Sequence, residues 1–224
     1  MTKVLNHHPS AEMLVEFSAG TLDTATAICV SAHLHHCKCC RDEVARLNQV
    51  GSQLMAEPTA ETVDENLFDK VMAKIDQSQP VVEANSEPET EPAISGFPAH
   101  VNKLIFNAIK APVWKRLSKS MEEAKLYTGQ DKFEVALHKI CAGGVTPKHN
   151  HRGLEYTVVL KGSFSDEKSV YTEGDFIIRK PGDVHQPMGA KNGECICLSA
   201  QEAPIRLTSL LGWFLNPWLR IKPA

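Results

Sequence analysis

The apolar positions of the first 77 residues recur at helical spacing. Met13, Leu14 and Phe17 form one such group, and Gly20 after them suits the end of a helix. Asp23 suits the N-cap of a following helix. The pattern predicts four helices, which run from about Pro9 to Gly20, from Asp23 toward His36, from Cys40 to Met55 and from Glu61 to Gln77.

The last of these segments has the clearest amphipathic pattern. Its apolar residues fall on one face of a helix and its polar residues fall on the other. The apolar residues are Leu67, Phe68, Val71, Met72 and Ile75. Periodicity alone favours a fourth core helix that packs on its own bundle.

From about residue 113 to 208 the pattern changes to short strands. Four stretches rich in Val, Ile, Phe, Tyr and Cys are separated by Gly or Pro turns, and they cover 133–140, 154–162, 175–183 and 194–200. Short strands at regular spacing predict a small sandwich or barrel. The chain is therefore expected to be multidomain, with an all-α domain over 1–77 and an all-β domain over 99–224.

Residues 78–98 separate these two regions. The stretch contains four prolines, four glutamates and no basic residue. Such a composition is typical of an extended, partly disordered segment. We expect it to act as a linker without chemistry of its own.

Composition and charge limit the kinds of molecule that the protein is expected to bind. The formal net charge of -3 gives no general reason to bind nucleic acid or an anionic membrane. No apolar run reaches the roughly 18 to 20 residues of a membrane span, and the first residues lack the apolar core of a secretory signal. We therefore expect a cytoplasmic protein that binds a protein or a small molecule, without direct contact to nucleic acid or membrane.

Because the cytoplasm keeps thiols reduced, the seven cysteines indicate metal ligation or thiol chemistry.

Imidazole and thiol side chains cluster between residues 33 and 40. On a continuous helix, His33, Cys37 and Cys40 lie on one side, because offsets of four and seven residues bring side chains to the same face. This mixed set suits zinc, which takes four tetrahedral ligands in structural sites. A fourth ligand is expected from His7 or His8, and spacing alone does not choose between them.

Neighbouring residues leave other assignments open for this cluster. Cys39, His35 and His36 could each replace one of the ligands. A Cys-x-x-Cys pair by itself is also typical of a redox site.

A second group of ligand-type residues lies in the strand region. His149 and His151 are two residues apart, so both can face the inside of a barrel, and Glu155 can return to the same place after a short turn. His185 adds a third imidazole. Three imidazoles and one carboxylate suit a divalent transition metal, and these residue types do not choose between iron, manganese, nickel, copper and zinc.

The spacing around the second group resembles the two cupin motifs. The glycines and ligand residues of both motifs are Gly143, His149, His151, Glu155, Gly162, Gly174, Gly182 and His185. Lys180 stands where a proline is usual, with Pro181 one residue later, and Gly189 stands where an asparagine is usual. The resemblance implies a jelly-roll barrel that binds a metal through the three histidines and the glutamate.

The two groups together resemble the sites of ChrR-type anti-sigma factors, a family in which a zinc-containing helical domain precedes a cupin domain. The shared segments are HH near the start, AGTL at 19–22, the His-x-x-x-Cys-x-x-Cys motif, HRGLE at 151–155 and CICL at 195–198. The resemblance implies that His8, His33, Cys37 and Cys40 bind zinc, and it favours zinc in the cupin domain as well. It also implies that the segment 61–77 is a helix that faces a partner, an extracytoplasmic-function sigma factor.

The same resemblance implies a regulatory rather than a catalytic role. The helical domain would inhibit the sigma factor, and the cupin domain would respond to an oxidative signal such as singlet oxygen or an organic hydroperoxide. Two alternatives remain: a metal-dependent cupin enzyme, such as a dioxygenase or an isomerase, and a metal-storage or metal-sensing protein. Cys141, Cys195 and Cys197 are candidate reactive thiols, although the last two alternate along a strand and could equally pack inside a barrel.

Overall fold

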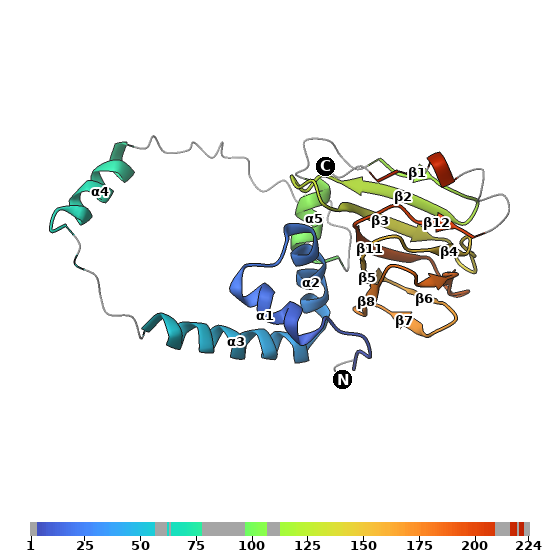
Figure 1. Ribbon diagram of the computed structural model, residues 1–224, viewed down its shortest axis with the longest axis horizontal. Helices are drawn as coiled ribbons and strands as arrows, with labels where there is room; N and C mark the ends of the chain where they lie inside the picture. The colour runs from blue at the N-terminus through green and yellow to red at the C-terminus, as the bar shows by residue number, and fades with distance from the viewer. Residues whose placement is uncertain are drawn as a thin grey trace.

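The protein consists of a group of helices beside a β-barrel (Figure 1). The structure is a computed structural model, and it describes residues 4–56, 62, 64–77, 97–106, 113–208, 216–218 and 220–221. The predicted linker over 78–98 lies outside the described residues except for its last two. Of these, Phe97 is buried against the apolar core.

The helices are α1 (Ala11–Ala19), α2 (Thr24–His36), α3 (Lys38–Ala56), α4 (Leu67–Gln77) and α5 (Ala99–Phe106). Ser10 caps α1 by accepting a hydrogen bond from the Met13 backbone, and Gly20 ends it with a φ of 70°. Asp23 caps α2 in the same way through Thr26, at 3.0 Å. The four expected helices are therefore present, and α5 is an additional one.

Two features of the helices differ from the prediction. The second helix ends at His36 as expected, but the continuous helix assumed for the spacing of His33, Cys37 and Cys40 is broken at Cys37, which has extended backbone angles of φ -103° and ψ 104°. The fourth helix begins at Leu67 rather than Glu61, after an Asp64 turn in which the side chain accepts a hydrogen bond from the Asn66 backbone at 3.0 Å. Both differences arise at turns, which the pattern of apolar residues does not predict.

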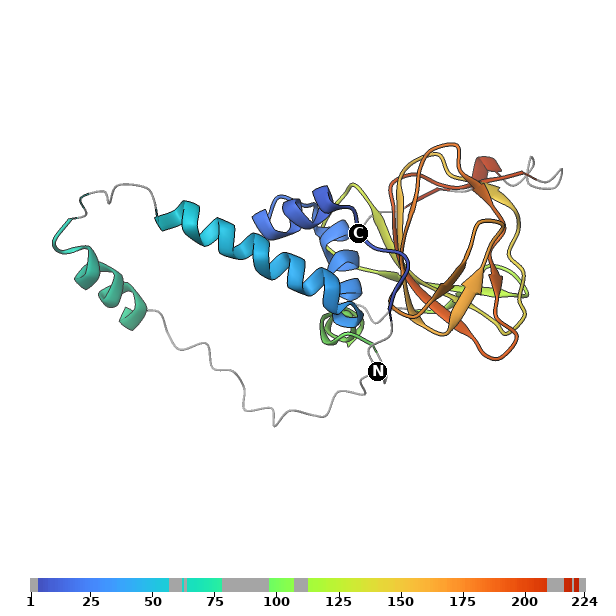
Figure 2. The ribbon, with the colours of Figure 1, turned by 90° about the horizontal axis from the view of Figure 1, so that it is seen from below.

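Antiparallel strands form the barrel, which Figure 2 shows in a view through its opening. A six-stranded sheet has the order β1-β2-β3-β11-β5-β8, and two three-stranded sheets have the orders β10-β6-β7 and β12-β4-β9. The strands are β1 (Lys115–Arg116), β2 (Met121–Leu126), β3 (Glu134–Ile140), β4 (His149–Asn150), β5 (Glu155–Lys161), β6 (Ser163–Ser165), β7 (Val170–Thr172), β8 (Phe176–Arg179), β9 (Val184–His185), β10 (Met188–Gly189), β11 (Cys195–Gln201) and β12 (Arg206–Leu207). A short 3-10 turn, η1, covers Asn216–Trp218. The expected all-β domain after an all-α region is confirmed.

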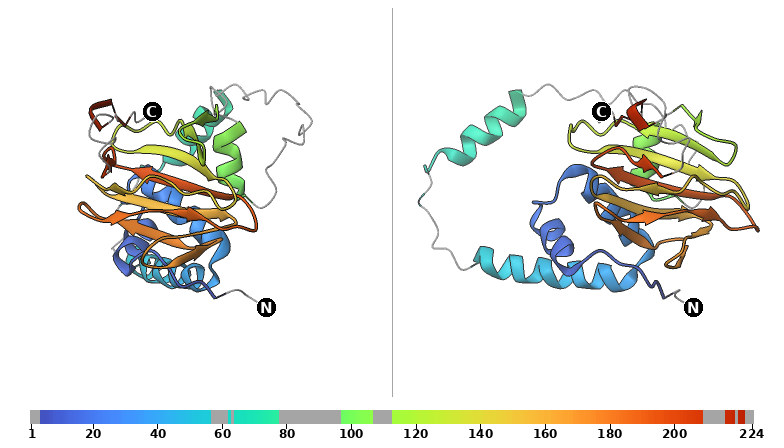
Figure 3. Two further views of the ribbon diagram at one scale, coloured as in Figure 1. Left: turned by 90° about the vertical axis from the view of Figure 1, so that its right-hand side faces the viewer. Right: turned by 45° about the vertical axis from the view of Figure 1, so that its right-hand side comes forward.

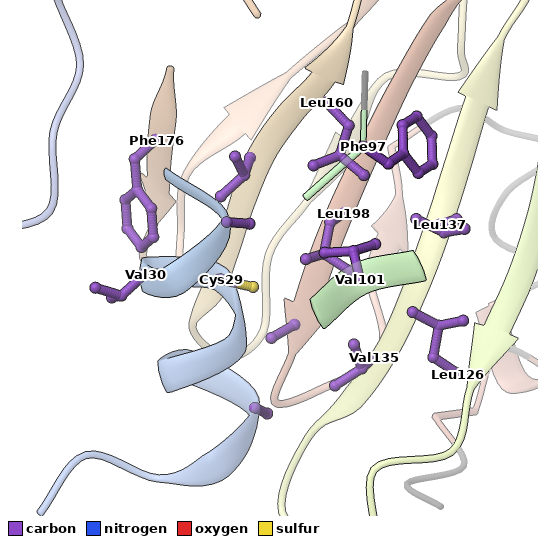
Figure 4. Packing of buried hydrophobic residues seen from close by; sticks show 14 of the residues in the cluster. Cys29, Val30, Phe97, Val101, Leu126, Val135, Leu137, Leu160, Phe176 and Leu198 are labelled. Atoms are coloured by element: carbon purple, nitrogen blue, oxygen red, sulfur yellow. The ribbon is translucent and has the colours of Figure 1, made fainter. Parts of the chain in front are cut away.

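The central strands of the six-stranded sheet, β3, β11 and β5, are buried on both faces. On β11, Cys195 and Cys197 belong to the apolar cluster inside the barrel, whereas Leu198 and Ala200 belong to the cluster shared with the helices. Figure 4 shows α2 and α5 lying over that outer face, with Val30 and Val101 among the packed side chains. Each fully buried Val or Leu stabilises such a contact by about 1.5–3 kcal/mol relative to exposure. One apolar core therefore joins the helical region to the barrel.

Helix α4 stands apart from the other described helices and from the barrel (Figures 1 and 3). None of its described side chains is buried. Among the described residues, no single helix is long and apolar enough to span a membrane; α1 and α2, bent by 109° to each other, meet that criterion together by length and composition only.

Candidate metal centres

The break between α2 and α3 gathers three of the ligand-type side chains. His33 lies in the last turn of α2, Cys37 ends that helix, and Cys40 lies in the first turn of α3. The Cys40 backbone N–H donates to Cys37 Sγ at 3.5 Å, which holds the two sulfurs side by side. His8 reaches the same place from the segment before α1. One ligand atom from each of these four residues lies within 4.8 Å of all the others.

The hydrogen bonds of the two imidazoles direct their lone pairs toward the sulfurs. His33 Nδ1 donates to the Gly174 carbonyl at 2.7 Å, so its unprotonated Nε2 faces Cys40 Sγ at 3.3 Å. His8 Nε2 donates to the Leu5 carbonyl at 3.0 Å, so its Nδ1 faces the sulfurs of Cys37 and Cys40, both at 3.4 Å. A tetrahedral ion with bonds of about 2.3 Å to sulfur and about 2.0 Å to nitrogen separates such atoms by about 3.5 Å. The cluster therefore fits a metal site.

Burial controls the protonation of this cluster. It lowers the pKa of His33 to about 4, which keeps the imidazole in its neutral, ligand-competent form at neutral pH. Burial and the neighbouring Cys37 raise the pKa of the Cys40 thiol. A divalent cation offsets this cost, because it stabilises the thiolate directly.

The other candidates near this cluster lie outside it. His7 Nε2 lies 3.1 Å from Ser169 Oγ, and the His7 ring lies 4.8 Å from the Tyr171 ring. Cys39 is exposed, and His36 lies 3.8 Å from the carboxylate of Glu173. The geometry thus brings His8, and not His7, to the two sulfurs.

This difference gives a direct test with adjacent residues. We expect a His8→Ala variant to lose the thiolate-bound metal and a His7→Ala variant to keep it, because only the former removes a donor from the cluster. Metal content and the absorption of a Co2+-substituted sample measure the difference. Equal metal loss from the two variants would contradict the assignment.

The second cluster forms where β4 and β9 pair. His149 and His185 are directly opposite each other in this antiparallel pair, and His151 follows β4. The Nε2 atom of His185 lies 3.0 Å from that of His149 and 3.0 Å from that of His151. All three histidines are nearly or fully buried. Pairing between strands thus joins residues that are more than thirty positions apart in the chain.

Each Nδ1 atom of the second cluster lies near an oxygen, although His151 Nδ1 makes no hydrogen bond to it. His149 donates to the Pro147 carbonyl at 3.0 Å, His151 lies 3.1 Å from a Glu155 carboxylate oxygen, and His185 lies 2.9 Å from Asp166 Oδ2. With the protons on Nδ1, three Nε2 lone pairs point at one another. Such an arrangement is unfavourable without a shared cation. Bonds of about 2.1 Å at right angles place two nitrogens about 3.0 Å apart, which matches the spacing.

Glu155 lies beside this cluster, with its carboxylate against His151. Burial alone would raise the pKa of Glu155, but the neighbouring His151 imidazole lowers it well below its usual range. The carboxylate is therefore ionised and close to the imidazoles. Its role as a fourth metal ligand remains a prediction.

Sequence reasoning missed the polar groups behind His185. Asp166 is buried and also pairs with the Arg179 guanidinium, which donates to Tyr171 Oη at 2.8 Å. Burial lowers the pKa of His185 to about 4, and the hydrogen bond to Asp166 opposes this shift. The available signal was Arg179, a charged residue that directly follows the apolar residues 176–178.

The three candidate thiols occupy different environments. Cys195 and Cys197 are buried inside the barrel with their sulfurs 3.6 Å apart. Cys141 is exposed. The hydrogen bond with Cys195, together with burial, raises the pKa of Cys197 well above its usual range, so this thiol is protonated at neutral pH.

The fold and the two clusters define a cupin protein that carries a helical region with a His- and Cys-based cluster that fits a metal ion. The family described as ChrR cupin-like domain matches residues 103–204. The anti-sigma-E factor ChrR of Cereibacter sphaeroides is 32% identical over 219 residues, which cover 97% of this chain and 99% of that protein. On this similarity, the chain belongs to the ChrR family of anti-sigma factors.

The solved structure of a ChrR complex agrees with this assignment. The crystal structure of Rhodobacter sphaeroides SigE in complex with the anti-sigma ChrR matches with a TM-score of 0.72 and 32% identity, covering 88% of this chain and 100% of that chain. An RmlC-like cupin protein from Ralstonia eutropha JMP134 has a TM-score of 0.40 and 17% identity, covering 45% of this chain and 69% of that chain. The similarity to ChrR extends over both the helical region and the barrel.

Proposed function

We propose that this protein is an anti-sigma factor that binds and inhibits an extracytoplasmic-function sigma factor. The observation that carries the proposal is the match to ChrR in complex with SigE, because it extends over nearly the whole chain. The role is regulatory rather than catalytic. Since sigma factors act with RNA polymerase, the protein acts in the cytoplasm and touches the sigma factor rather than nucleic acid or a membrane.

The exposed apolar side chains support a protein partner. Phe68 on α4 is 72% exposed, and Leu67, Val71 and Met72 on the same helix are also exposed. The last part of α3 adds Leu54 and Met55, which are 61% and 81% exposed. Apolar surface of this extent is costly in water and marks an interaction site. An amphipathic helix that presents its apolar face is suited to a groove on a partner protein.

The metal sites have different roles in this proposal. Zinc bound by His8, His33, Cys37 and Cys40 would stabilise the helical domain, because mixed imidazole and thiolate sets suit zinc in structural sites. The cupin centre would hold zinc or another divalent transition metal through His149, His151, His185 and Glu155. The cupin domain would then receive an oxidative signal, such as singlet oxygen or an organic hydroperoxide, and cause release of the sigma factor.

Co-expression tests the partner directly. We expect the tagged full-length chain to retain one extracytoplasmic-function sigma factor of its host through purification and to block transcription from promoters that this factor serves. A set of the host's other sigma factors provides the control. If no sigma factor is retained, and the chain instead converts a small substrate, the protein is a cupin enzyme and the proposal is wrong.

The role of the cupin centre has its own test. We expect a His149→Ala, His185→Ala variant to bind the sigma factor as the unchanged protein does but to fail to release it under singlet oxygen or organic hydroperoxide, because the variant lacks two donors of that centre. Transcription from a promoter of the sigma factor measures release in cells. Induction equal to that of the unchanged protein would exclude the centre from signal reception.

A further inference from the structure

The segment 166–175 touches both metal centres. It contains β7 and the turn that leads to β8. At its start, Asp166 Oδ2 accepts a hydrogen bond from the cupin ligand His185 at 2.9 Å, and near its end the Gly174 carbonyl accepts one from His33 at 2.7 Å. We propose that this segment positions imidazoles of both centres and thereby couples metal retention in the helical region to the state of the cupin centre. The coupling itself does not depend on the proposed function, and only its role in regulation rests on it.

At the helical end, one buried carboxylate holds the turn and the segment before His8. Asp175 Oδ2 accepts hydrogen bonds from the Thr172 backbone at 2.7 Å and from the Thr172 hydroxyl at 3.0 Å. Asp175 Oδ1 accepts from the Asn6 and His7 backbones, both at 3.2 Å. The contacts that orient His8 and those that orient His33 therefore meet at the same turn of the barrel.

The turn approaches the helical region too closely for any residue larger than glycine. Gly174 has a φ of 93°, and a Cβ added there would lie 2.7 Å from His36 Cβ and 2.9 Å from Leu5 Cδ1. Gly182 has a nearly equal φ of 94°, but a Cβ there would meet no atom within 4 Å. These two glycines share the backbone requirement and differ in the contact with the helical region.

Tyr171 connects the two ends of the segment. Its hydroxyl lies 3.3 Å from Asp166 Oδ1, and its ring lies against His7, the residue before the ligand His8. Both Tyr171 and Asp166 are buried. Hydrogen bonds from residues outside a metal centre orient its ligands. A displacement of His185 therefore changes the hydrogen bonds of Asp166, and the packed contacts of β7 transmit this change toward the helical region. Coupling of this kind is reciprocal, so metal in either centre favours metal in the other.

The first test compares Gly174→Ala with Gly182→Ala in the full-length protein loaded with Co2+. Thiolate bound to Co2+ produces a charge-transfer absorption band, and a Cys37→Ser variant assigns this band to the helical centre. We expect the band to disappear about 10- to 100-fold faster in excess chelator for Gly174→Ala, since outer contacts contribute that much to metal affinity. Gly182→Ala should match the unchanged protein. Equal rates for the two variants would overturn the positioning role.

A second pair of variants keeps the test decisive if Gly174→Ala fails to fold. Asp175→Asn preserves the size of the side chain but removes acceptor capacity, and it should also accelerate loss of the thiolate band. Asp64→Asn is the control, because Asp64 holds the turn before α4 through the Asn66 backbone at 3.0 Å and belongs to neither cluster. If Asp175→Asn releases Co2+ no faster than Asp64→Asn, the proposal is wrong.

A third pair of variants tests the coupling from the end of the segment that contacts the cupin centre. Asp166→Asn changes the contact with His185, so we expect several-fold faster loss of the thiolate band, although Asp166 lies at the cupin centre. Glu194→Gln, which removes an exposed carboxylate beside Lys161 and outside the segment, is the control. Faster metal loss that is confined to the cupin centre would overturn the coupling. None of these measurements involves a sigma factor, so they remain decisive even if the proposed function fails.

Discussion

Replacing Cys37 and Cys40 together with serine is expected to abolish sigma-factor binding. The substitution removes both sulfur donors from the cluster that joins the start of the chain to α2 and α3. Structural zinc contributes roughly 10–16 kcal/mol to the folding of small zinc-finger peptides. That contribution equals or exceeds the whole stability of a typical domain, about 5–15 kcal/mol. We therefore expect α1 and α3 to lose their fixed positions.

Exposed Cys39 provides the matched control for this prediction. It lies between the two replaced residues but outside the cluster, so Cys39→Ser should retain zinc and full affinity. Zinc content, far-ultraviolet circular dichroism and calorimetric titration with the sigma factor measure the three consequences. Tight binding by the doubly substituted, zinc-free protein would show that the metal is not needed for inhibition.

Placing serine at both Phe68 and Met72 of α4 is expected to weaken sigma-factor binding by roughly 100- to 1000-fold. Central apolar residues of an interface cost about 2 kcal/mol or more each when truncated, and each 1.4 kcal/mol is a tenfold change in affinity. The fold should be unaffected, because no described side chain of α4 is buried. The melting temperature of the free protein should therefore stay unchanged.

Gln77→Ser is the control on the polar side of the same helix. It introduces the same residue type without removing apolar surface, so its dissociation constant should remain within about twofold of the unchanged value. Titration calorimetry or surface plasmon resonance distinguishes the variants. If the Phe68 and Met72 substitutions leave the affinity unchanged, α4 does not face the partner.

The two predictions separate two ways in which inhibition can fail. The cysteine substitutions remove the support of the helical region, whereas the α4 substitutions leave that support intact and remove contact area. The first variant should lose zinc and helical order along with affinity. The second should lose affinity alone.

Much of the helical region could be predicted from sequence because its determinants are local. Ser10 and Asp23 satisfy the free N–H groups of the helices that follow them, and Gly20 adopts the backbone angles that end α1. The spacing of the histidines in the barrel also shows in the sequence, since alternation along strands determines which side chains share a face. Hydrogen bonds and sterics within a few residues produce these features.

Other features depend on residues that are distant in the chain. The sequence left His7 and His8 as alternatives, and the structure brings His8 to the sulfurs because His7 instead contacts Ser169 and Tyr171 of the barrel. The bond from His33 to Gly174 joins residues separated by 141 positions. No local pattern encodes such a contact, because it exists only after α2 has packed on the sheet.

The sequence by itself determined the fold class, most helix boundaries, and the residue types of both metal centres. Only the tertiary structure decided which imidazole meets the thiols, which ring nitrogens face the centre of each cluster, and how the helices cover the outer face of the six-stranded sheet. The physical reason is the range of the interactions: caps and periodic burial act over a few residues, whereas ligand orientation depends on acceptors, such as Gly174 and Asp166, that folding brings from elsewhere in the chain.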